Sequence, residues 1–280
     1  MLLNNINKFC NFFFLFLLFS NIVVFSIYAK ERIPHTLKEV GVSENIGEQV
    51  PLDLVFTNEL GEKVTLQDYF QSDKSIILNL AYYTCPMLCH LVATGLHTSL
   101  TQLPFNIGGK YEVISLSIDP GDTIENAKAF ENKYASSLKG EKPKDYWHFL
   151  VGDQENISKL AEAVGFRYRF NSKTQQFAHS AAIMFLTPEG KLKRYLYGIE
   201  YKPLDVRLGI LESIDRNKIS GVERVLLFCY NYDPQGKKYV IYAYNVMRIG
   251  GLFTVIFIIL MIYYFLREEK KVNFRNEDNS

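Results

Sequence analysis

The sequence predicts a mixed α/β domain built on a layered sheet, and three observations support this prediction. Residues 75–82 and 111–118 are short runs rich in β-branched and aliphatic side chains, which is typical of buried strands. Residues 181–186 and 192–197 flank a Pro-Glu-Gly turn and form a candidate hairpin. Residues 153–164 repeat apolar side chains with the period of a helix. Strands that alternate with helices and end in a hairpin indicate a mixed α/β layered sheet.

The helix predicted over residues 153–164 has clear boundary signals. Asp153 is a capping residue at its start, and Gly165 follows as a stop. Helices are also expected over residues 123–138 and 204–219. Together these elements place one domain at residues 44–222.

The first 29 residues are typical of a secretory signal peptide. Lys8 precedes an uninterrupted apolar run at residues 12–19, and the small residue Ala29 stands just before the first dense charges. An uncleaved N-terminal anchor is the alternative, because residues 9–28 approach spanning length. Both interpretations export the rest of the chain, with residues 30–43 as a linker.

The C-terminal part contains a candidate transmembrane helix at residues 249–266. This run is apolar throughout and has the length of about 18 residues that a spanning helix needs. Arg267, Lys270 and Lys271 follow it, which predicts a cytoplasmic tail at residues 267–280. The Tyr-rich residues 223–248 are expected to be a juxtamembrane connector, and tyrosines suit a membrane interface.

The overall charge excludes one class of partner. Lys and Arg number 31 against 30 Asp and Glu, so the formal net charge of the 280 residues is +1. This balance gives no electrostatic footprint for nucleic acid, and we expect no nucleic-acid partner. The four cysteines are too few for a disulfide scaffold, so each must be interpreted by its position.

The chemistry is concentrated after the first strand, in the run Cys85-Pro86-Met87-Leu88-Cys89. On a helix that starts here, Cys85 and Cys89 lie about 40° apart, because positions i and i+4 are neighbours. Pro86 then suits the first turn, where its missing N–H costs nothing. A thiol at the positive end of the helix dipole has a lowered pKa.

This cysteine pair has two interpretations. A buried inert pair or a stabilising disulfide is one, although closing so short a loop removes little chain entropy. The other is metal or redox chemistry, since two thiolates are soft ligands for copper(I), zinc or iron–sulfur. A metal needs a third ligand from elsewhere in the chain. The candidates are His35, His90, His97, His148, His179 and Cys229.

The positions of the histidines rank these candidates. His90 and His97 project away from the cysteines on the predicted helix and are expected to be solvated. His148 falls in a predicted strand, where a structural histidine is the ordinary expectation. His35 lies in the linker. His179 stands where a loop enters the hairpin strand, which is where binding sites are often built.

Over residues 45–215 these features together resemble the Sco/SenC copper proteins. The resemblance is carried by the strand followed by Cys85-Pro86-Met87-Leu88-Cys89, by Ser117-Ile118-Asp119-Pro120 with Asp122-Thr123, and by His179, 90 residues after Cys89. It implies a thioredoxin-like three-layer fold, here with a C-terminal transmembrane helix. It also implies Cys85, Cys89 and His179 as copper ligands, with Cys85 and Cys89 as a redox disulfide pair. We expect Asp119 to be a structural turn residue.

The function that the resemblance implies is that of a copper metallochaperone. Such proteins are tethered to the membrane and serve the assembly of the binuclear copper centre of cytochrome c oxidase, whose copper-centre subunit is then the partner. Other copper chaperones and thioredoxin-like reductants are further implied partners. The implied location is the bacterial cytoplasmic membrane, with the globular domain on the periplasmic side.

Three other functions stay open. One is a thiol-disulfide oxidoreductase in which Cys85 attacks and Cys89 resolves. Another is a thiol peroxidase with Cys85 as the peroxidatic thiol, although Thr84 touches Cys85 directly and the Thr-x-x-Cys context is missing. A purely structural membrane-tethered module is the third.

Two features depart from the family's pattern. His90 stands where family members commonly have proline, which allows either a looser turn or an extra transient ligand. The anchor is C-terminal, behind Cys229, whereas many members have an N-terminal anchor. For Cys229 we favour an unpaired thiol near the membrane over an added copper ligand or an intermolecular contact.

Overall fold

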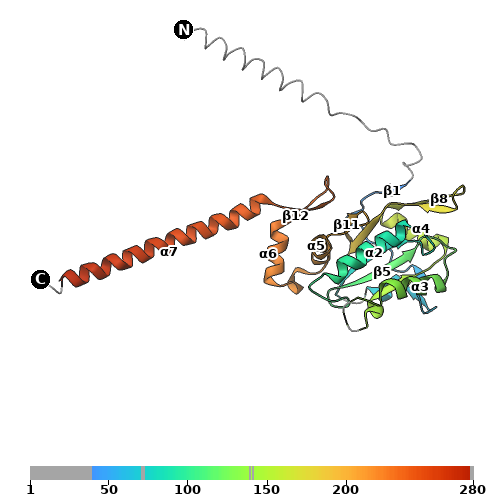
Figure 1. Ribbon diagram of the computed structural model, residues 1–280, viewed down its shortest axis with the longest axis horizontal. Coiled ribbons are helices and arrows are strands. Elements are labelled where there is room, and N and C mark those ends of the chain that lie inside the picture. The colour runs from blue at the N-terminus through green and yellow to red at the C-terminus, as the bar shows by residue number, and fades with distance from the viewer. Residues whose placement is uncertain (1–39, 71–72, 139, 141, 278–280) are drawn as a thin grey trace, which may run out of the picture. The chain divides into compact units, whose positions relative to one another are not determined.

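The computed structural model describes residues 40–277, apart from residues 71–72, 139 and 141 (Figure 1). The predicted signal segment, Cys10 and His35 therefore lie outside the described residues. The short elements β1 (Gly41–Val42) and β7 (Phe166–Arg167) pair with each other, and β2 (Val55–Thr57) pairs with β3 (Lys63–Thr65).

A five-stranded sheet with the order β11-β10-β4-β5-β6 forms the centre of the domain. Its strands are β4 (Ser75–Ala81), β5 (Tyr111–Ser117), β6 (Trp147–Leu150), β10 (Ala182–Leu186) and β11 (Leu192–Tyr197). β4, β5 and β6 run parallel, whereas β10 pairs antiparallel with β4 and with β11. Every residue of β4 and β5 is buried, as expected for parallel strands covered on both faces. The predicted strands and the predicted hairpin are confirmed.

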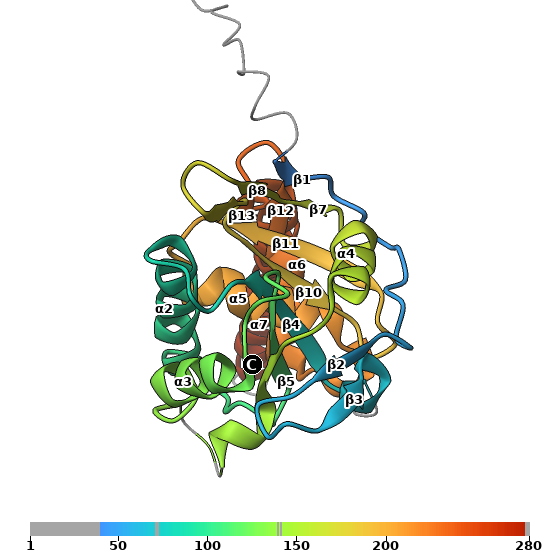
Figure 2. The same ribbon diagram turned by 90° about the vertical axis from the view of Figure 1, so that its right-hand side faces the viewer.

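Helices cover both faces of this sheet and make three layers. They are α2 (Leu88–Thr101), α3 (Ile124–Tyr134), α4 (Gln154–Ala163) and α5 (Pro203–Ser213). Figure 2 shows α2 and α3 on one side of the sheet and α4 on the other. Side chains alternate along a strand, so Ile77 belongs to the core under α2, α3 and α5, while Leu78 belongs to the core under α4.

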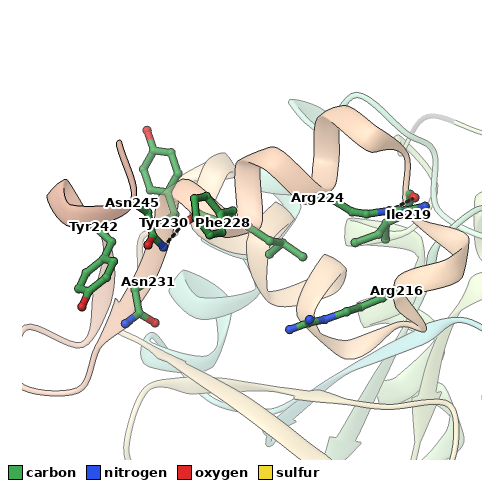
Figure 3. A pocket seen from close by; sticks show the side chains of 9 residues that line it. Arg216, Ile219, Arg224, Phe228, Tyr230, Asn231, Tyr242 and Asn245 are labelled. Carbon is green, nitrogen blue, oxygen red and sulfur yellow. Dashed lines mark hydrogen bonds between the residues drawn. The ribbon is translucent and has the colours of Figure 1, made fainter. Parts of the chain in front are cut away.

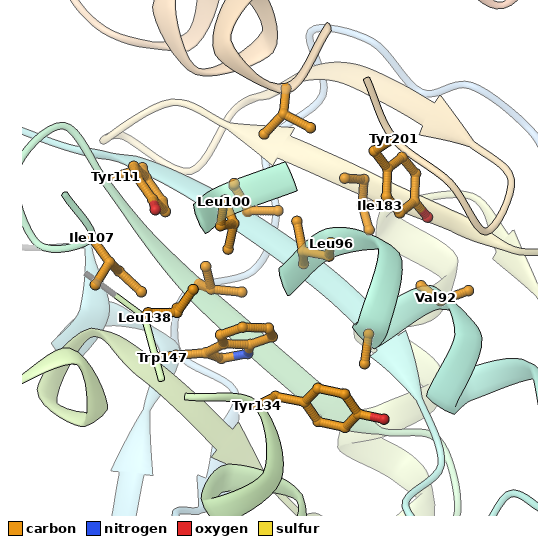
Figure 4. Close-up of a cluster of buried hydrophobic side chains, with 14 of the residues drawn as sticks. Val92, Leu96, Leu100, Ile107, Tyr111, Tyr134, Leu138, Trp147, Ile183 and Tyr201 are labelled. Carbon is orange, nitrogen blue, oxygen red and sulfur yellow. The ribbon is translucent and has the colours of Figure 1, made fainter. Parts of the chain in front are cut away.

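The core under α2 and α3 is rich in aromatic side chains (Figure 4). Leu96 and Leu100 of α2 pack there with Tyr134 of α3 and with Trp147, which is fully buried. The Trp147 Nε1–H donates to Ser115 Oγ at 3.0 Å, which satisfies the polar atom of the only tryptophan in the chain. This face therefore fixes α2, the helix that carries Cys89, against the sheet.

Two predicted helices end earlier than expected. α3 ends at Tyr134, and α5 ends at Ser213, because Ile214 is extended. The Asp215 side chain then accepts the N–H of Asn217 and starts a separate 3-10 turn, η5 (Arg216–Lys218). An aspartate that caps a new turn competes with continuation of the helix.

The α4 helix matches its predicted boundaries. Asp153 accepts the N–H of Asn156 at 2.8 Å, and Gly165 adopts a φ of +61° directly after the helix. A Cβ at Gly165 would overlap the carbonyl of Ser43. Both the left-handed backbone and this close approach require glycine here.

The residues expected to be a connector, 223–248, contain regular structure that packs on the domain. α6 (Gly221–Cys229) leads into a hairpin of β12 (Tyr230–Asp233) and β13 (Lys238–Ile241). Tyr232 and Tyr239 of this hairpin are buried in the α2-side core. The Tyr239 hydroxyl donates to Glu212 Oε2 at 2.9 Å. Alternating tyrosines thus hold the hairpin to α5.

α7 (Ala243–Glu277) follows the hairpin after one residue, Tyr242. Its stretch Tyr244–Tyr263 has a mean hydropathy of 2.3 and is long and apolar enough to cross a membrane. None of this stretch is buried in the structure. The candidate span therefore begins five residues before the predicted one, and its exposure argues against a soluble core helix.

Candidate metal centre

The loop that carries Cys85 directly follows β4. The Cys85 N–H donates to the Tyr82 carbonyl at 3.2 Å, and α2 begins only at Leu88. The expectation that Cys85 and Pro86 lie in the first turn of the helix is therefore wrong. The reason is Pro86, because a proline disfavours the helical conformation of the residue before it.

The two cysteines nevertheless lie together. Cys85 Sγ accepts the backbone N–H of Cys89 at 3.4 Å, and Cys89 Sγ accepts the N–H of Tyr82 at 3.4 Å. Both are free thiols, and both are buried. The Cys85 sulfur thus satisfies one of the N–H groups that the start of a helix leaves without a partner, which is the role of a capping side chain.

These surroundings separate the pKa values of the two thiols. Burial alone would raise the pKa of Cys85, but hydrogen bonds from the N–H groups of Cys89 and Met87 and from the Cys89 and Tyr82 side chains lower it overall. Burial raises the pKa of Cys89, and the neighbouring Cys85 charge raises it further. Cys85 is therefore the first thiol to ionise.

A hairpin absent from the sequence-based prediction brings His179 to the thiols. β8 (Arg169–Asn171) pairs with β9 (Gln176–Ala178), and His179 follows β9 directly. His179 Nε2 lies 3.1 Å from Cys89 Sγ, although 90 residues separate the two. The proximity implied by the family resemblance is thus present in the structure.

The protonation of His179 follows from its second contact. Its Nδ1 lies 3.0 Å from the Ser180 carbonyl oxygen, which can only accept, so Nδ1 carries the hydrogen. Burial lowers the pKa of His179, although the Ser180 bond opposes this, so the imidazole is neutral at neutral pH. Its Nε2 lone pair therefore faces Cys89. A backbone carbonyl that fixes the tautomer in this way is typical behind a metal-binding histidine.

Aromatic rings surround the imidazole. The rings of Tyr82 and Phe166 lie 6.1 Å and 5.9 Å from the His179 ring between centroids. Phe177 lies 5.5 Å from Tyr82 on the same side. Such a shell limits water around the sulfur and nitrogen atoms and strengthens their mutual interactions.

The donors do not form a closed cluster. Among the residues that the structure describes, no group of three or more His, Cys, Asp or Glu side chains lies close enough together to hold a metal ion. Cys89 instead contacts Cys85 on one side and His179 on the other. Two thiols and one neutral imidazole fit copper(I) by softness, and a metal would have to draw them together.

The other candidate ligands lie elsewhere. His90 stacks on Phe130 with 4.9 Å between ring centroids, and its Nδ1 lies 2.9 Å from the Tyr134 hydroxyl. His97 Nε2 lies 2.8 Å from Ser137 Oγ. Both rings are half-buried against α3 and the turn after it, so the expectation that they are solvated is wrong. The amphipathic pattern of α2 could not reveal a second helix on its polar side.

His148 and Cys229 are also separate from the thiols. His148 lies in β6, as predicted, with its nitrogens 3.9 Å from Glu59 Oε1 and 3.7 Å from Glu112 Oε2. Cys229 ends α6, where its carbonyl accepts the N–H of Tyr242 beside the start of α7. This placement fits the expected unpaired thiol near the candidate span.

One supporting residue has a role that sequence reasoning did not assign. Asp122 is buried, and its Oδ2 accepts the N–H of Tyr83 at 2.7 Å and the Ser117 hydroxyl at 2.6 Å. It thereby ties the Cys85 loop to the end of β5. The signal was an acidic residue just after a buried strand. Asp119, by contrast, accepts the N–H of Gly121 at 2.8 Å, as a turn residue does.

Several solved structures are similar to this chain. A putative electron transfer protein from Aquifex aeolicus VF5 is 26% identical over 63% of this chain and 98% of its own, with a TM-score of 0.54. A putative electron transport protein from the same organism is 27% identical over 62% of this chain and 99% of its own, with a TM-score of 0.50. The copper-bound Arabidopsis thaliana ScoI is 19% identical over 56% of this chain and 90% of its own, with a TM-score of 0.45.

Among curated proteins, none matches this chain. The sequence model of the SCO1/SenC family matches residues 45–206, which is more than half of the chain and includes Cys85, Cys89 and His179. The expected thioredoxin-like fold is thereby confirmed. The protein belongs to the SCO1/SenC family.

Proposed function

We propose that this protein is a membrane-tethered copper chaperone. Cys85, Cys89 and His179 bind a copper ion and pass it to the copper-centre subunit of cytochrome c oxidase during assembly. The observation that carries the proposal is the 3.1 Å approach of His179 Nε2 to Cys89 Sγ, next to a second thiol. Two sulfurs and one neutral imidazole nitrogen are the donor set that soft copper(I) prefers.

The hydrogen bonds around the two thiols and His179 support a proposed order of copper binding. Cys85 ionises first and supplies the first thiolate. Cys89 then loses its proton as copper takes the place of the S–H···N contact with His179. His179 needs no deprotonation, because its Nε2 already carries the lone pair. Binding therefore requires the reduced dithiol, and oxidation to a disulfide abolishes it.

The surface around the thiols suits a protein partner. Met87 and Leu91, on either side of the buried Cys89, are 66% and 40% exposed. Pro86 is exposed beside them. An apolar rim around buried donors allows a partner to dock and exclude water while ligands exchange.

The tether in this proposal is α7. The Tyr244–Tyr263 stretch spans the bacterial cytoplasmic membrane, and the globular domain faces the periplasm. Support comes from the length and apolarity of the stretch, and from Lys and Arg residues after it at positions 267, 270, 271 and 275.

The decisive test measures copper(I) binding to the reduced, oxygen-free full chain in detergent. Cys85→Ser, Cys89→Ser and His179→Ala are compared with the wild type, and His97→Ala serves as a matched control on α2. The proposal expects near-stoichiometric copper in the wild type and the control, and copper lost or greatly weakened in the other three. Copper retained by Cys85→Ser and Cys89→Ser would refute the site.

The separated pKa values of Cys85 and Cys89 favour a second candidate function, thiol-disulfide exchange. The Cys85 thiolate would attack a target disulfide and form a mixed disulfide, and Cys89 would then displace the second target thiol. The target gains two electrons and becomes a dithiol, while Cys85 and Cys89 become a disulfide. A trapped mixed disulfide on Cys89→Ser, with no copper bound by the reduced wild type, would favour this function over copper delivery.

A further inference from the structure

A cavity of about 440 Å³ lies where α7 begins, and the copper site does not use it. Residues of η5, α6, β12 and the start of α7 line it. Figure 3 shows Arg216 and Arg224 at one end, and Tyr242, Asn231 and Asn245 at the other.

This cavity is positively charged. No acidic side chain is among its lining residues, whereas two arginines are. Arg224 Nε donates to the Ile219 carbonyl at 3.3 Å, which leaves its two terminal amino groups for a ligand. Arg216 is exposed, and no described residue accepts a hydrogen bond from its guanidinium.

The nearest carboxylates in the sequence, Asp215 and Glu223, are not among the residues that line the cavity. Asp215 accepts the N–H of Asn217 at 2.9 Å. Glu223 is buried and accepts from Lys110 Nζ at 2.7 Å. No carboxylate therefore faces the two arginines inside the cavity, and a guanidinium pair is well suited to a phosphate group.

The outer face of α6 is apolar. Val222, Val225 and Phe228 follow one another at a spacing of three residues and lie on one side of this helix. Their exposed fractions are 78%, 54% and 42%. Water is an unfavourable environment for a row of this kind, which marks a surface that meets something apolar.

Hydrogen bonds fix α6 and the cavity to the first turn of α7. Asn245 Nδ2 donates to the Phe228 carbonyl at 2.7 Å, and the Tyr242 N–H donates to the Cys229 carbonyl at 2.8 Å. The candidate span begins at Tyr244, between these two donors. The cavity and the apolar face therefore lie at the depth where a spanning α7 meets the lipid headgroups.

We propose that this cavity binds the phosphate headgroup of an anionic phospholipid. Arg216 and Arg224 hold the phosphate, while Val222, Val225 and Phe228 enter the leaflet on the side of the globular domain. The proposal rests on the membrane tether proposed above. A lipid is favoured over a protein partner because the cavity adjoins the first residues of the candidate span, at the level of the lipid headgroups.

The test uses the full chain in nanodiscs of phosphatidylcholine that contain a minor fraction of phosphatidylglycerol. After mild delipidation, native mass spectrometry counts how many molecules of each lipid stay bound to one protein molecule. The wild type is compared with Arg216→Gln/Arg224→Gln and with the control Lys128→Gln/Lys193→Gln, which removes the same charge from exposed positions away from the cavity. Trp147 fluorescence verifies that all three proteins are folded.

We expect the wild type and the control to retain phosphatidylglycerol in preference to phosphatidylcholine. In the arginine variant this preference is expected to be about 30-fold weaker. No preference in the wild type, or an unchanged preference in the arginine variant, would overturn the proposal. Inorganic phosphate bound at the two arginines by a wild type that shows no lipid preference would overturn the lipid as ligand. Binding of a purified oxidase subunit at this face, without any lipid preference, would show that the face binds a protein and not a lipid.

The same samples separate this proposal from the proposed function. Copper(I) binding and resistance to alkaline carbonate extraction are measured in parallel. An integral, copper-binding protein without a lipid preference overturns only the lipid site. Extraction by carbonate overturns the tether and the lipid site together.

Discussion

Gly95 of α2 packs directly against the carbonyl group of Ile199, in the loop before α5. A Cβ at position 95 would overlap that oxygen, and the backbone of Glu200 lies next to it. Glycine at this point is therefore a requirement of packing, and it lies on the helix that carries Cys89.

Gly95→Ala is expected to destabilise the domain by roughly 1–3 kcal/mol, because the added methyl group must push α2 and the loop apart. Gly221→Ala is the control, since nothing lies within contact distance of a Cβ there. Urea unfolding in detergent, followed by Trp147 fluorescence, measures both changes. Equal stability of the two variants would contradict the close packing.

Asp122→Ala is expected to cost about 2 kcal/mol and to weaken copper binding. The substitution leaves the buried N–H of Tyr83 without its acceptor and releases the loop that positions Cys85. Asp119→Ala, which loses one contact in a more exposed turn, should cost less than about 1 kcal/mol. Unfolding and copper(I) titration of the two variants side by side test this ranking.

The two thiols are expected to titrate in a fixed order. Hydrogen bonds lower the pKa of Cys85, whereas burial and the neighbouring charge raise that of Cys89. Thiolate absorbance measured against pH should show a midpoint below the ordinary thiol value in Cys89→Ser and above it in Cys85→Ser. A reversed order would remove Cys85 as the first ligand and as the attacking thiol.

His148 is expected to make stability depend on pH. Burial lowers its pKa, but Glu112 and Glu59 outweigh this, so the folded-state pKa lies above the ordinary 6.5. The imidazolium therefore stabilises the fold fully below about pH 6.5, and this contribution is lost as pH rises through the folded-state pKa. His148 should therefore contribute a fall in the free energy of unfolding as pH rises above about 6.5.

His148→Gln is the control for this slope. It removes the titrating group, so most of the fall over the same pH range should disappear. Glu59 and Glu112 have lowered pKa values, so their own contributions change only below the ordinary value of 4.5. A slope that persists in the variant would assign the effect to another group.

Local patterns in the sequence were sufficient for the sheet. β4 and β5 are continuous apolar runs, and the β10–β11 hairpin is marked by its Pro-Glu-Gly turn, so both could be predicted. α6 carries a local signal, the capping box of Ser220 and Glu223, which the sequence-based prediction did not use. The β12–β13 hairpin was missed because its stability comes from the burial of Tyr232 and Tyr239 against distant residues.

The candidate site could also be predicted only in part from local sequence patterns. Cys85 and Cys89 stand out because they are close in the sequence and follow a buried strand. The approach of His179 depends on the β8–β9 hairpin, whose short exposed strands carry little apolar signal, so only the family resemblance indicated it. The late start of α2 after Pro86 depends on proline sterics, which the helical projection ignored.

With α7 as the tether proposed above, the single residue between β13 and α7 would limit how far the candidate metal site can travel. A flexible tether of many residues would let a domain sweep a large volume above a bilayer, whereas one extended residue reaches only about 3.5 Å. A domain held so closely searches for its target in two dimensions, by lateral diffusion of the whole molecule. In the proposed function, the acceptor would then have to expose its own copper ligands close to the membrane surface, within the height of one small domain.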